Sequence, residues 1–268
     1  MEFFSLLIST VLLRPYVFVF LGMSLFSAIR LLGWTRTQWM FSLTWAVAFL
    51  CEFSSTRNGF PFGEYYYTGS TLGEELYISN IPFMDSLSFT FLLYASYCLA
   101  LTCVLSMRQG GAGSTWDINV RDRTSWPVIV LTALFMMFID IVIDPVALRG
   151  DRWFLGLIYG YAHPGVYFGV PLENFLGWAT VGGLSIGLYS VVDRYRLSDS
   201  SFPQEAIRGT LLWGVGLYYL VLAFNLVMTF WIGEILLGMV GCLIYLPVSF
   251  LITLRILGWA PVPALKDV

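Results

Sequence analysis

The sequence predicts an all-α integral membrane protein. The chain has 268 residues, of which 58% are hydrophobic and 18% aromatic, and only 12% carry a charge. Soluble domains contain about 25% charged residues, roughly twice this share. Helices are the expected spanning form, because a helix satisfies its own backbone hydrogen bonds and the alternating pattern of barrel strands is absent. We therefore expect a polytopic helix bundle.

Apolar runs near the ~20 residues needed to cross hydrocarbon predict about seven transmembrane helices. They lie at 16–33, 37–53, 83–106, 126–148, 172–192, 210–232 and 235–257. Residues 3–13 form a shorter apolar stretch, suited to an interfacial or re-entrant eighth helix. There is no second domain in the pattern and no linker long enough to join one. Residues 1–268 are therefore expected to form a single transmembrane domain.

The basic residues predict how this bundle is oriented. If successive helices alternate in direction, one side receives four basic residues, namely Arg14, Arg57, Arg149 and Arg152. The other ten, which include Lys266, fall on the opposite side. Lys and Arg are enriched in cytoplasmic loops, so the richer side and the carboxyl terminus are predicted to be cytoplasmic. This describes a multi-pass protein of the cytoplasmic membrane.

Acidic residues gather near the predicted outer ends of the helices. They are Glu52, Asp85, Asp140, Asp144, Glu173 and Glu234. Acids scattered by chance would not favour one leaflet, and intramembrane acids are costly and usually functional. The pattern predicts a polar cavity in the outer half of the bilayer.

The segment FIDIVIDP carries the sharpest pair of acids. Asp140 and Asp144 are four residues apart, which places both on one helix face. Two carboxyl groups in a low dielectric tend to retain a shared proton, so the pair is a candidate proton donor. Pro145 disfavours helical geometry at Asp144, and we expect the helix to end or kink there.

Two aromatic segments accompany these acids. Residues 52–69 read EFSSTRNGFPFGEYYYTG, and residues 162–178 read AHPGVYFGVPLENFLGW. Gly and Pro bend both segments and leave their rings free to face a cavity, where aromatic faces could stabilise a carbocation or grip a polyene. Asn174 could hold a water or a partner acid.

Structural alternatives exist for each feature. The acids could form ion pairs that only lock helices together, with Arg57, Arg149 or Arg152 as partners. The aromatic segments could be a membrane-interface belt, which Tyr and Trp form routinely. Glu173 could simply stabilise a helix N-terminus, where a carboxylate is favoured. Asn225 and Glu234 could form hydrogen bonds between helices.

Cofactor and metal chemistry is not expected. The chain has one histidine, His163, and its four cysteines form no CxxC pair, so thiols buried in the core are the better interpretation. Walker A, GxGxxG and HExxH motifs, basic nucleic-acid patches and DDxxD-like Mg²⁺ clusters are missing. The sequence predicts no metal, no cofactor, no nucleic acid and a neutral substrate.

The combination of EFSSTRNGFPFGEYYYT, DIVIDP and YFGVPLENFLGW resembles the CruF-type carotenoid hydratases, a membrane family of carotenoid biosynthesis. The likeness runs from about residue 45 to residue 195, and the TRxGFPFGxYxYT element is its most specific part. Positions that match the family pattern are Glu52, Arg57, Gly63, Tyr65, Tyr67, Thr68, Asp140, Asp144, Pro145, Tyr167, Gly169, Pro171, Asn174 and Trp178. Asp85 and Glu173 depart from it.

The resemblance implies addition of water to the terminal C1=C2 double bond of an acyclic carotenoid end, which gives a tertiary alcohol without a cofactor. The partners would be water and a bilayer-dissolved carotenoid, similar to lycopene, γ-carotene or bisanhydrobacterioruberin. Asp140 and Asp144 would supply the proton, and Glu52 would position or activate water. Pocket and orienting residues would be Arg57, Phe62, Glu64, Tyr65, Tyr67, Tyr167, Asn174 and Trp178.

Two other functions fit the same residues. The acid could start ring closure, since a cyclase also passes through a cation. The protein could instead be a proton-coupled lipid carrier, because intramembrane acids are common in proton relays. Carriers of that kind often contain internal repeats, and none is evident here.

Overall fold

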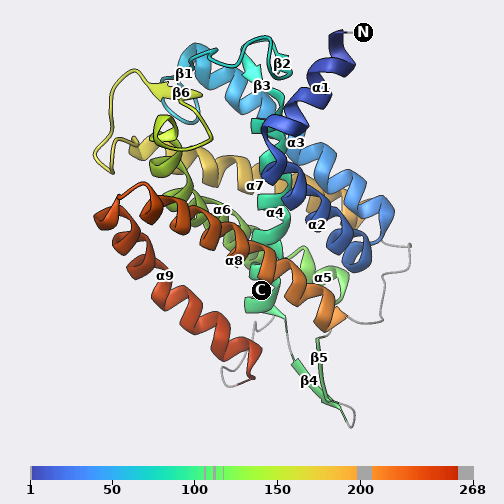
Figure 1. Ribbon diagram of the computed structural model, residues 1–268. Helices are drawn as coiled ribbons and strands as arrows, with labels where there is room; N and C mark the ends of the chain where they lie inside the picture. The colour runs from blue at the N-terminus through green and yellow to red at the C-terminus, as the bar shows by residue number, and fades with distance from the viewer. Residues whose placement is uncertain (1, 106, 111–112, 117, 198–206, 259–268) are drawn as a thin grey trace.

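The computed structural model describes residues 2–105, 107–110, 113–116, 118–197 and 207–258. Most of these residues are helical, as Figure 1 shows. The helices are α1 (Glu2–Leu13), α2 (Pro15–Leu32), α3 (Trp34–Asn58), α4 (Phe83–Val104), α5 (Val120–Arg123), α6 (Trp126–Ala147), α7 (Leu172–Tyr195), α8 (Ile207–Trp231) and α9 (Ile235–Ile256). The predicted helix bundle is confirmed. Lys266 and the carboxyl terminus lie outside the described residues.

Within the described part of the chain, six helices are long and apolar enough to cross a membrane. They correspond to the predicted runs except for 37–53, which belongs to α3. α3 has 25 residues, about 37 Å of helix at 1.5 Å per residue. It carries Arg36, Glu52 and Arg57 together with many Thr and Ser residues, which lower its hydropathy. The short stretch predicted at 3–13 is helical and forms most of α1.

α6 corrects one expectation about Pro145. The helix continues through this proline and ends at Ala147, so it does not end at Asp144, and a kink at this position stays a prediction. Pro145 lies within the last turn, where few further backbone hydrogen bonds are lost. Asp140 and Asp144 therefore share one continuous helix face, and both are buried.

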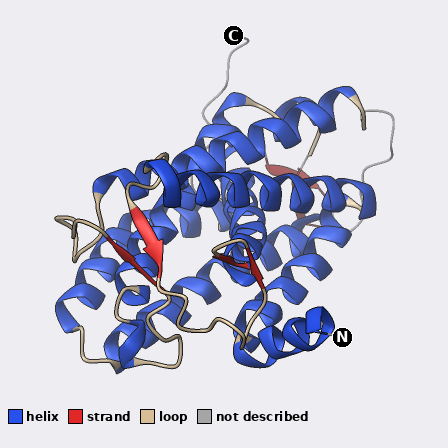
Figure 2. Cartoon of the chain, turned by 90° about the horizontal axis from the view of Figure 1, so that it is seen from above, coloured by secondary structure: helices blue, strands red, loops and turns tan. Residues whose placement is uncertain are grey.

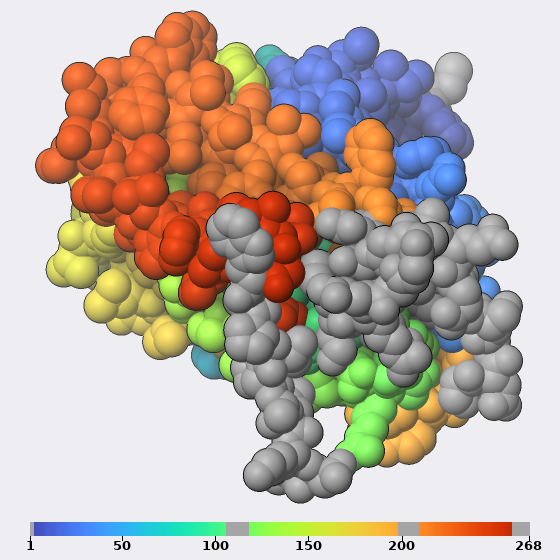
Figure 3. Space-filling view, turned by 90° about the horizontal axis from the view of Figure 1, so that it is seen from below, coloured from blue at the N-terminus to red at the C-terminus, as the bar shows by residue number. Residues whose placement is uncertain are grey.

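α4 is the central helix of the bundle, as Figure 1 shows. It packs against α2, α3, α6 and α8. Every residue from Phe89 to Thr102 is buried, so the helix is enclosed on all sides. On one flank α8 packs against α2, and Figure 3 shows the orange surface of α8 beside the blue surface of the first helices.

Short strands cross the ends of the bundle, and the sequence did not predict them. β1 (Tyr65–Tyr67) pairs with β6 (Tyr159–Tyr161), β2 (Tyr77–Ile78) pairs with β3 (Ile81–Pro82), and β4 (Met107–Gly110) pairs with β5 (Gly113–Trp116). Figure 2, seen from above, shows strands (red) lying across the helices. We call the end that carries β1 and β6 the acid end, and the end that carries β4 and β5 the opposite end.

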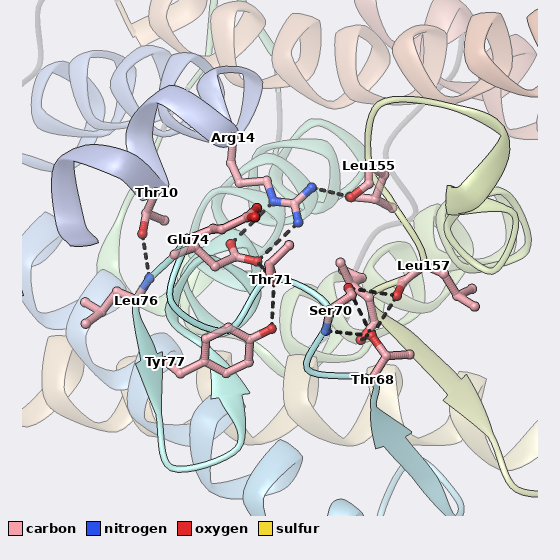
Figure 4. Close-up of polar contacts among 12 residues, drawn as sticks. Thr10, Arg14, Thr68, Ser70, Thr71, Glu74, Leu76, Tyr77, Leu155 and Leu157 are labelled. Carbon is pink, nitrogen blue, oxygen red and sulfur yellow. Dashed lines mark hydrogen bonds and ion pairs between the residues drawn. The ribbon is translucent and has the colours of Figure 1, made fainter. Parts of the chain in front are cut away.

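A buried ion pair fastens the loops at the acid end. Arg14, in the turn between α1 and α2, bonds to Glu75 at 3.2 Å and donates to the carbonyl of Leu155 at 2.5 Å. Thr71 donates to the same Glu75 carboxylate at 2.5 Å. Figure 4 shows Arg14 between these two loop segments, which are far apart in sequence. The contacts hold the loops that follow β1 and precede β6 in a fixed position over the helices.

The opposite end is held by a second buried ionic cluster. Asp193 at the end of α7 accepts from Arg36 of α3 at 2.8 Å and from Arg123 of α5 at 2.6 Å. All three residues are at most 3% exposed. Removing one partner of such a buried pair leaves an uncompensated charge, which typically costs about 3–5 kcal/mol. The cluster therefore fixes α3, α5 and α7 relative to one another.

Candidate active site

Four tyrosines on the β1–β6 ribbon form the roof of a site at the acid end. In this ribbon Tyr65 pairs with Tyr161 and Tyr67 pairs with Tyr159. Alternate residues of a strand point to the same face, so the four rings lie together, with centroids 5.4–6.3 Å apart. Tyr66 points away and is 53% exposed.

Asn174 joins the two aspartates of α6. Its side-chain Nδ2 donates to Oδ2 of Asp140 and to Oδ2 of Asp144, both at 2.6 Å. Asp144 also accepts from the hydroxyls of Tyr159 at 2.9 Å and Tyr161 at 3.0 Å. Oδ1 of Asp140 is buried and has no hydrogen-bond partner. An ionised oxygen in that position would be strongly destabilised, since a buried charge requires a donor or a counter-ion.

A second pair of acids joins α3 to α4. The hydroxyl of Tyr67 lies 3.2 Å from Oε1 of Glu52 and 2.5 Å from Oδ2 of Asp85, so one phenol is shared by two carboxyl groups. Ser86 donates to the other oxygen of Glu52. Tyr65 donates to the Tyr67 hydroxyl at 3.4 Å. The ribbon therefore bonds to both acid pairs, through Tyr67 on one side and through Tyr159 and Tyr161 on the other.

These phenols remain protonated donors. Burial raises the pKa of Tyr65 and Tyr67, and the charges of Glu52 and Asp85 raise it further. Burial likewise raises the pKa of Tyr159 and Tyr161, with Asp144 as the next cause. A neutral phenol donates one proton to a carboxylate and accepts another from water or a neighbour. The roof can therefore orient both acid pairs without adding charge.

Between the acid pairs lies a cavity of about 40 Å³, which we call the acid cavity. A cavity needs roughly 10–15 Å³ to hold one water molecule, so this one has room for a few. Its wall combines carboxyl, hydroxyl and amide groups with aromatic rings, of which Phe89 stacks on Trp178 with ring centroids 4.3 Å apart. The lining residues are Glu52, Phe62, Tyr65, Tyr67, Asp85, Phe89, Asp144, Tyr159, Tyr161, Asn174 and Trp178.

Most residues predicted for the site come together here. Seven of them line the acid cavity, namely Glu52, Phe62, Tyr65, Tyr67, Asp144, Asn174 and Trp178. Asp140 lies behind this wall and reaches it through Asn174. Phe62 is held by its backbone N–H, which donates to Ser55 at 2.9 Å, and by packing against Gly177 of α7.

Three predicted residues lie elsewhere. The Arg57 guanidinium sits over the Phe53 ring at 3.4 Å and donates to the Phe53 carbonyl and to Ser79. Because α3 extends to Asn58, Arg57 is more than one turn beyond Glu52 and on another face. Glu64 lines a surface groove of about 1100 Å³ together with His163. The ring of Tyr167 packs against Phe168 and Phe175.

Two arginines at the acid end bond to groups other than Asp140 and Asp144. Arg149 donates to the carbonyls of Pro145 and Phe168 and forms an ion pair with Glu234 at 3.0 Å. Arg152 pairs with the same Glu234 carboxylate. These contacts satisfy two of the three arginines considered as helix-locking partners of the aspartates, and Glu234 links both to the α8–α9 turn.

Three polar residues of the site were not assigned from sequence. Asp85 was noted only as an acid near a helix end, although an acid at the start of an apolar run is a usable signal. Tyr159 and Tyr161 lie in the segment YGY, which has the same Tyr-x-Tyr spacing as residues 65–67. An i, i+2 spacing puts both rings of such a segment on one face if the segment is a strand, but it does not show which segments pair.

Metal coordination has little support in these side chains. Across residues 2–105, 107–110, 113–116, 118–197 and 207–258, no group of three or more His, Cys, Asp or Glu side chains is arranged to hold a metal ion. The carboxyl groups of the acid cavity instead bond to tyrosine, serine and asparagine donors.

The fold and the site together define a polytopic α-helical membrane protein with two pairs of buried carboxyl groups around a small aromatic-walled cavity. The chain belongs to the carotenoid biosynthesis protein family, whose pattern it matches over residues 6–246.

It is similar to bisanhydrobacterioruberin hydratase of Haloarcula japonica, with 31% identity over 175 residues. The alignment covers 63% of this chain and 52% of that protein, so the chain spans about half the length of this curated relative. No solved structure matches the chain.

Proposed function

We propose that the protein is a carotenoid hydratase that adds water by acid catalysis to the terminal C1=C2 double bond of an acyclic carotenoid. The observation that carries this proposal is the pair of dicarboxyl clusters facing one water-sized cavity, with stacked aromatic rings on its wall. Hydration of an alkene needs a proton donor, a place for a cation and a water whose proton can leave. Family membership and the similarity to a hydratase support the same reaction.

Asp140 and Asp144 would supply the proton. The orphaned Oδ1 of Asp140 favours a neutral carboxyl in this pair, and Asn174 bridges the two groups at 2.6 Å. In the first step the proton that the orphaned Oδ1 assigns to Asp140 shifts to Asp144, which lines the acid cavity. The new Asp144 O–H bond then breaks as the π electrons of the alkene form a C–H bond at C2. A tertiary cation remains at C1, and Asp144 becomes a carboxylate that Tyr159 and Tyr161 stabilise by donation.

Aromatic rings would stabilise this cation. Phe89 and Trp178 stack in the wall of the acid cavity, and Phe62 packs edge-on against Tyr65 beside them. A cation within about 6 Å of an aromatic face gains roughly 2 kcal/mol or more when both are desolvated.

Glu52 would then accept the proton of the attacking water. The water oxygen bonds to C1, and its surplus proton passes to Glu52, directly or through the shared hydroxyl of Tyr67. Return of that proton to the Asp140–Asp144 pair through the tyrosine hydroxyls and cavity waters closes the cycle. The net change is the addition of one water, with no electron transfer and no cofactor.

Expression of Asp144→Asn in a host that makes an acyclic carotenoid tests the proposal. The wild-type protein should add the mass of one water to the pigment, measured by chromatography and mass spectrometry, and the variant should make no such product. Asp151→Asn, which changes an exposed acid of the neighbouring turn, is the matched control and should retain activity. Unchanged hydration by Asp144→Asn would remove Asp144 from the mechanism, and an isomer of unchanged mass would indicate a cyclase.

A further inference from the structure

A second cavity adjoins the acid cavity and differs from it in chemistry. It has a volume of about 110 Å³ and lies between α2, α4, α6 and α8. Its walls are mostly apolar, with Phe20, Phe91, Leu92, Ile143, Val221 and Phe224 among the lining residues. We call it the apolar chamber.

The apolar chamber and the acid cavity share part of their lining. Asp85, Asp144, Tyr159 and Trp178 line both. The large surface groove beside Glu64, by contrast, has no lining residue in common with the acid cavity. One carboxyl group from each acid pair therefore faces the apolar chamber as well as the acid cavity. A molecule in the chamber would reach these acids without passing the groove.

The volumes separate the roles of the two spaces. About 40 Å³ suits a few water molecules, whereas an apolar cavity of about 150 Å³ stays dry and binds benzene, a six-carbon ring. The 110 Å³ of the apolar chamber is close to that value and fits a unit of about five carbons. A branched isoprenoid terminus has this size.

Several aromatic rings in and around the chamber wall pack against one another. Tyr16 stacks on Phe224 at 5.4 Å, Phe20 contacts Phe91 at 5.7 Å and Phe224 at 5.8 Å, and Trp153 lies 6.3 Å from Phe224. These rings come from α2, α4, α8 and the loop after α6, which are distant in sequence. They exclude water and present polarisable faces to any positive charge that develops at the shared wall.

We propose that the apolar chamber is the binding site for one acyclic isoprenoid end of the substrate. The end group occupies the chamber with its terminal double bond at the wall formed by Asp85 and Asp144, and the acid cavity delivers water from the other side of that wall. This inference rests on the proposed function. It adds a basis for specificity: an acyclic terminus fits the chamber, whereas a six-membered ring with its methyl groups exceeds it.

Filling the chamber tests this assignment. Val221 of α8 is 3% exposed and lines the chamber without touching the acid cavity, whereas Val227 of the same helix is 63% exposed. Val221→Phe should lower both hydrated product and pigment co-purified with the protein by about tenfold or more, because the added ring takes the substrate's space. Val227→Phe, the same substitution on the outer face, should retain both.

A second measurement does not depend on a bulky side chain. Ser88→Cys places a thiol in the chamber wall by a nearly isosteric change, and Cys242, exposed on α9, is an internal reference. An acyclic carotenoid should slow alkylation at position 88 by about tenfold relative to Cys242, as measured by peptide mass spectrometry. Equal alkylation with and without the carotenoid would overturn the assignment.

The outcomes separate this inference from the proposed function. If the wild type hydrates the pigment and Val221→Phe does so equally well, the chamber is not the end-group site, although the protein is still a hydratase. If the wild type makes no hydrated product but Ser88→Cys is protected by the carotenoid, the hydratase proposal fails while the chamber remains a binding site for isoprenoid ends.

Discussion

At the scale of single residues, position in the ribbon decides what each tyrosine does. Three consecutive tyrosines, 65 to 67, have the same chemistry, yet only the first and third face the acid cavity. Tyr66 lies on the other face and packs over Gly160, where a Cβ atom would come within 3.0 Å of its hydroxyl. The Tyr66 ring thus covers Gly160 on the outer face of the ribbon, away from the acid cavity.

Tyr67→Phe should weaken hydration strongly. The change removes the hydroxyl that bonds to Glu52 and Asp85 and leaves the aromatic ring in place. A hydrogen bond to a charged group contributes about 1.5–3 kcal/mol, so product formation should fall roughly 10- to 100-fold. Tyr66→Phe is the matched control and should leave the rate unchanged. If both variants hydrate the carotenoid at the wild-type rate, the Tyr67 hydroxyl has no part in the reaction.

At the scale of elements, α7 connects the site to the rest of the bundle. It carries Asn174 in its first turn at the acid end and Asp193 in its last turn, within the ionic cluster at the opposite end. Gly177 lies against the loop that carries Phe62, and a Cβ atom there would meet the Phe62 ring at 2.4 Å and the Pro61 carbonyl at 2.9 Å. The loop can approach α7 only because this residue lacks a side chain.

Gly177→Ala should therefore displace Phe62 from the acid cavity. Overpacking of this kind costs about 1–3 kcal/mol, which should appear as a lower midpoint of thermal unfolding in detergent together with less hydrated product. Gly187→Ala makes the same change on the same helix, where no atom lies within 4 Å. It should stabilise the helix by up to about 1 kcal/mol or leave it unchanged. Equal midpoints and rates for the two variants would contradict this role of Gly177.

The elements also show how far sequence reasoning reaches. Apolar runs predicted the long helices because burial of apolar side chains in lipid depends on composition over about 20 residues. The strands β1 and β6 could not be placed in the same way, since three-residue strands form only when a partner some 90 residues away is brought beside them. Tyr159 and Tyr161 were missed for this reason. Arg57 was expected near the acids because helical extension of α3 to Asn58 was not foreseen.

At the scale of the whole molecule, Glu234 links the loop after α6 to the α8–α9 turn. Burial alone would raise the pKa of Glu234, but its hydrogen bonds and ion pairs with Arg149 and Arg152 lower it overall. A carboxyl group whose pKa is lower in the folded state contributes stability above its unfolded pKa of about 4.3. That contribution is lost as the pH falls through the lower folded value.

Glu234→Gln should accordingly lower the midpoint of thermal unfolding at pH 7. The ion pairs are partly exposed, so the expected effect is about 1 kcal/mol or less. The difference between wild type and variant should shrink as the pH falls below about 4 and the carboxylate of the wild type becomes protonated. A difference of the same size at pH 7 and at pH 3 would contradict the link to Arg149 and Arg152.

The orientation in the membrane is a further prediction at this scale. The arginines assigned to one side, such as Arg14 and Arg149, do lie at the acid end, while Arg36 and Arg123 lie at the opposite end. We propose that the acid end faces outward in the cytoplasmic membrane, with the carboxyl terminus inside. Thiols introduced by Phe60→Cys and Thr115→Cys should react from opposite sides of sealed vesicles. Reaction of both from one side would contradict this topology.

The sequence by itself determined the membrane class, the long helices and the identity of most acids and rings of the candidate site. These features depend on local composition and on i, i+4 spacing, which a single chain displays directly. Only the tertiary structure decided that Asp85 joins Glu52 through Tyr67, that Asn174 bridges Asp140 and Asp144, and that a water-sized cavity adjoins an apolar chamber. Such neighbours come from segments far apart in the chain, from Tyr16 to Asn225 in the lining of the apolar chamber. Their contacts arise from packing of whole helices.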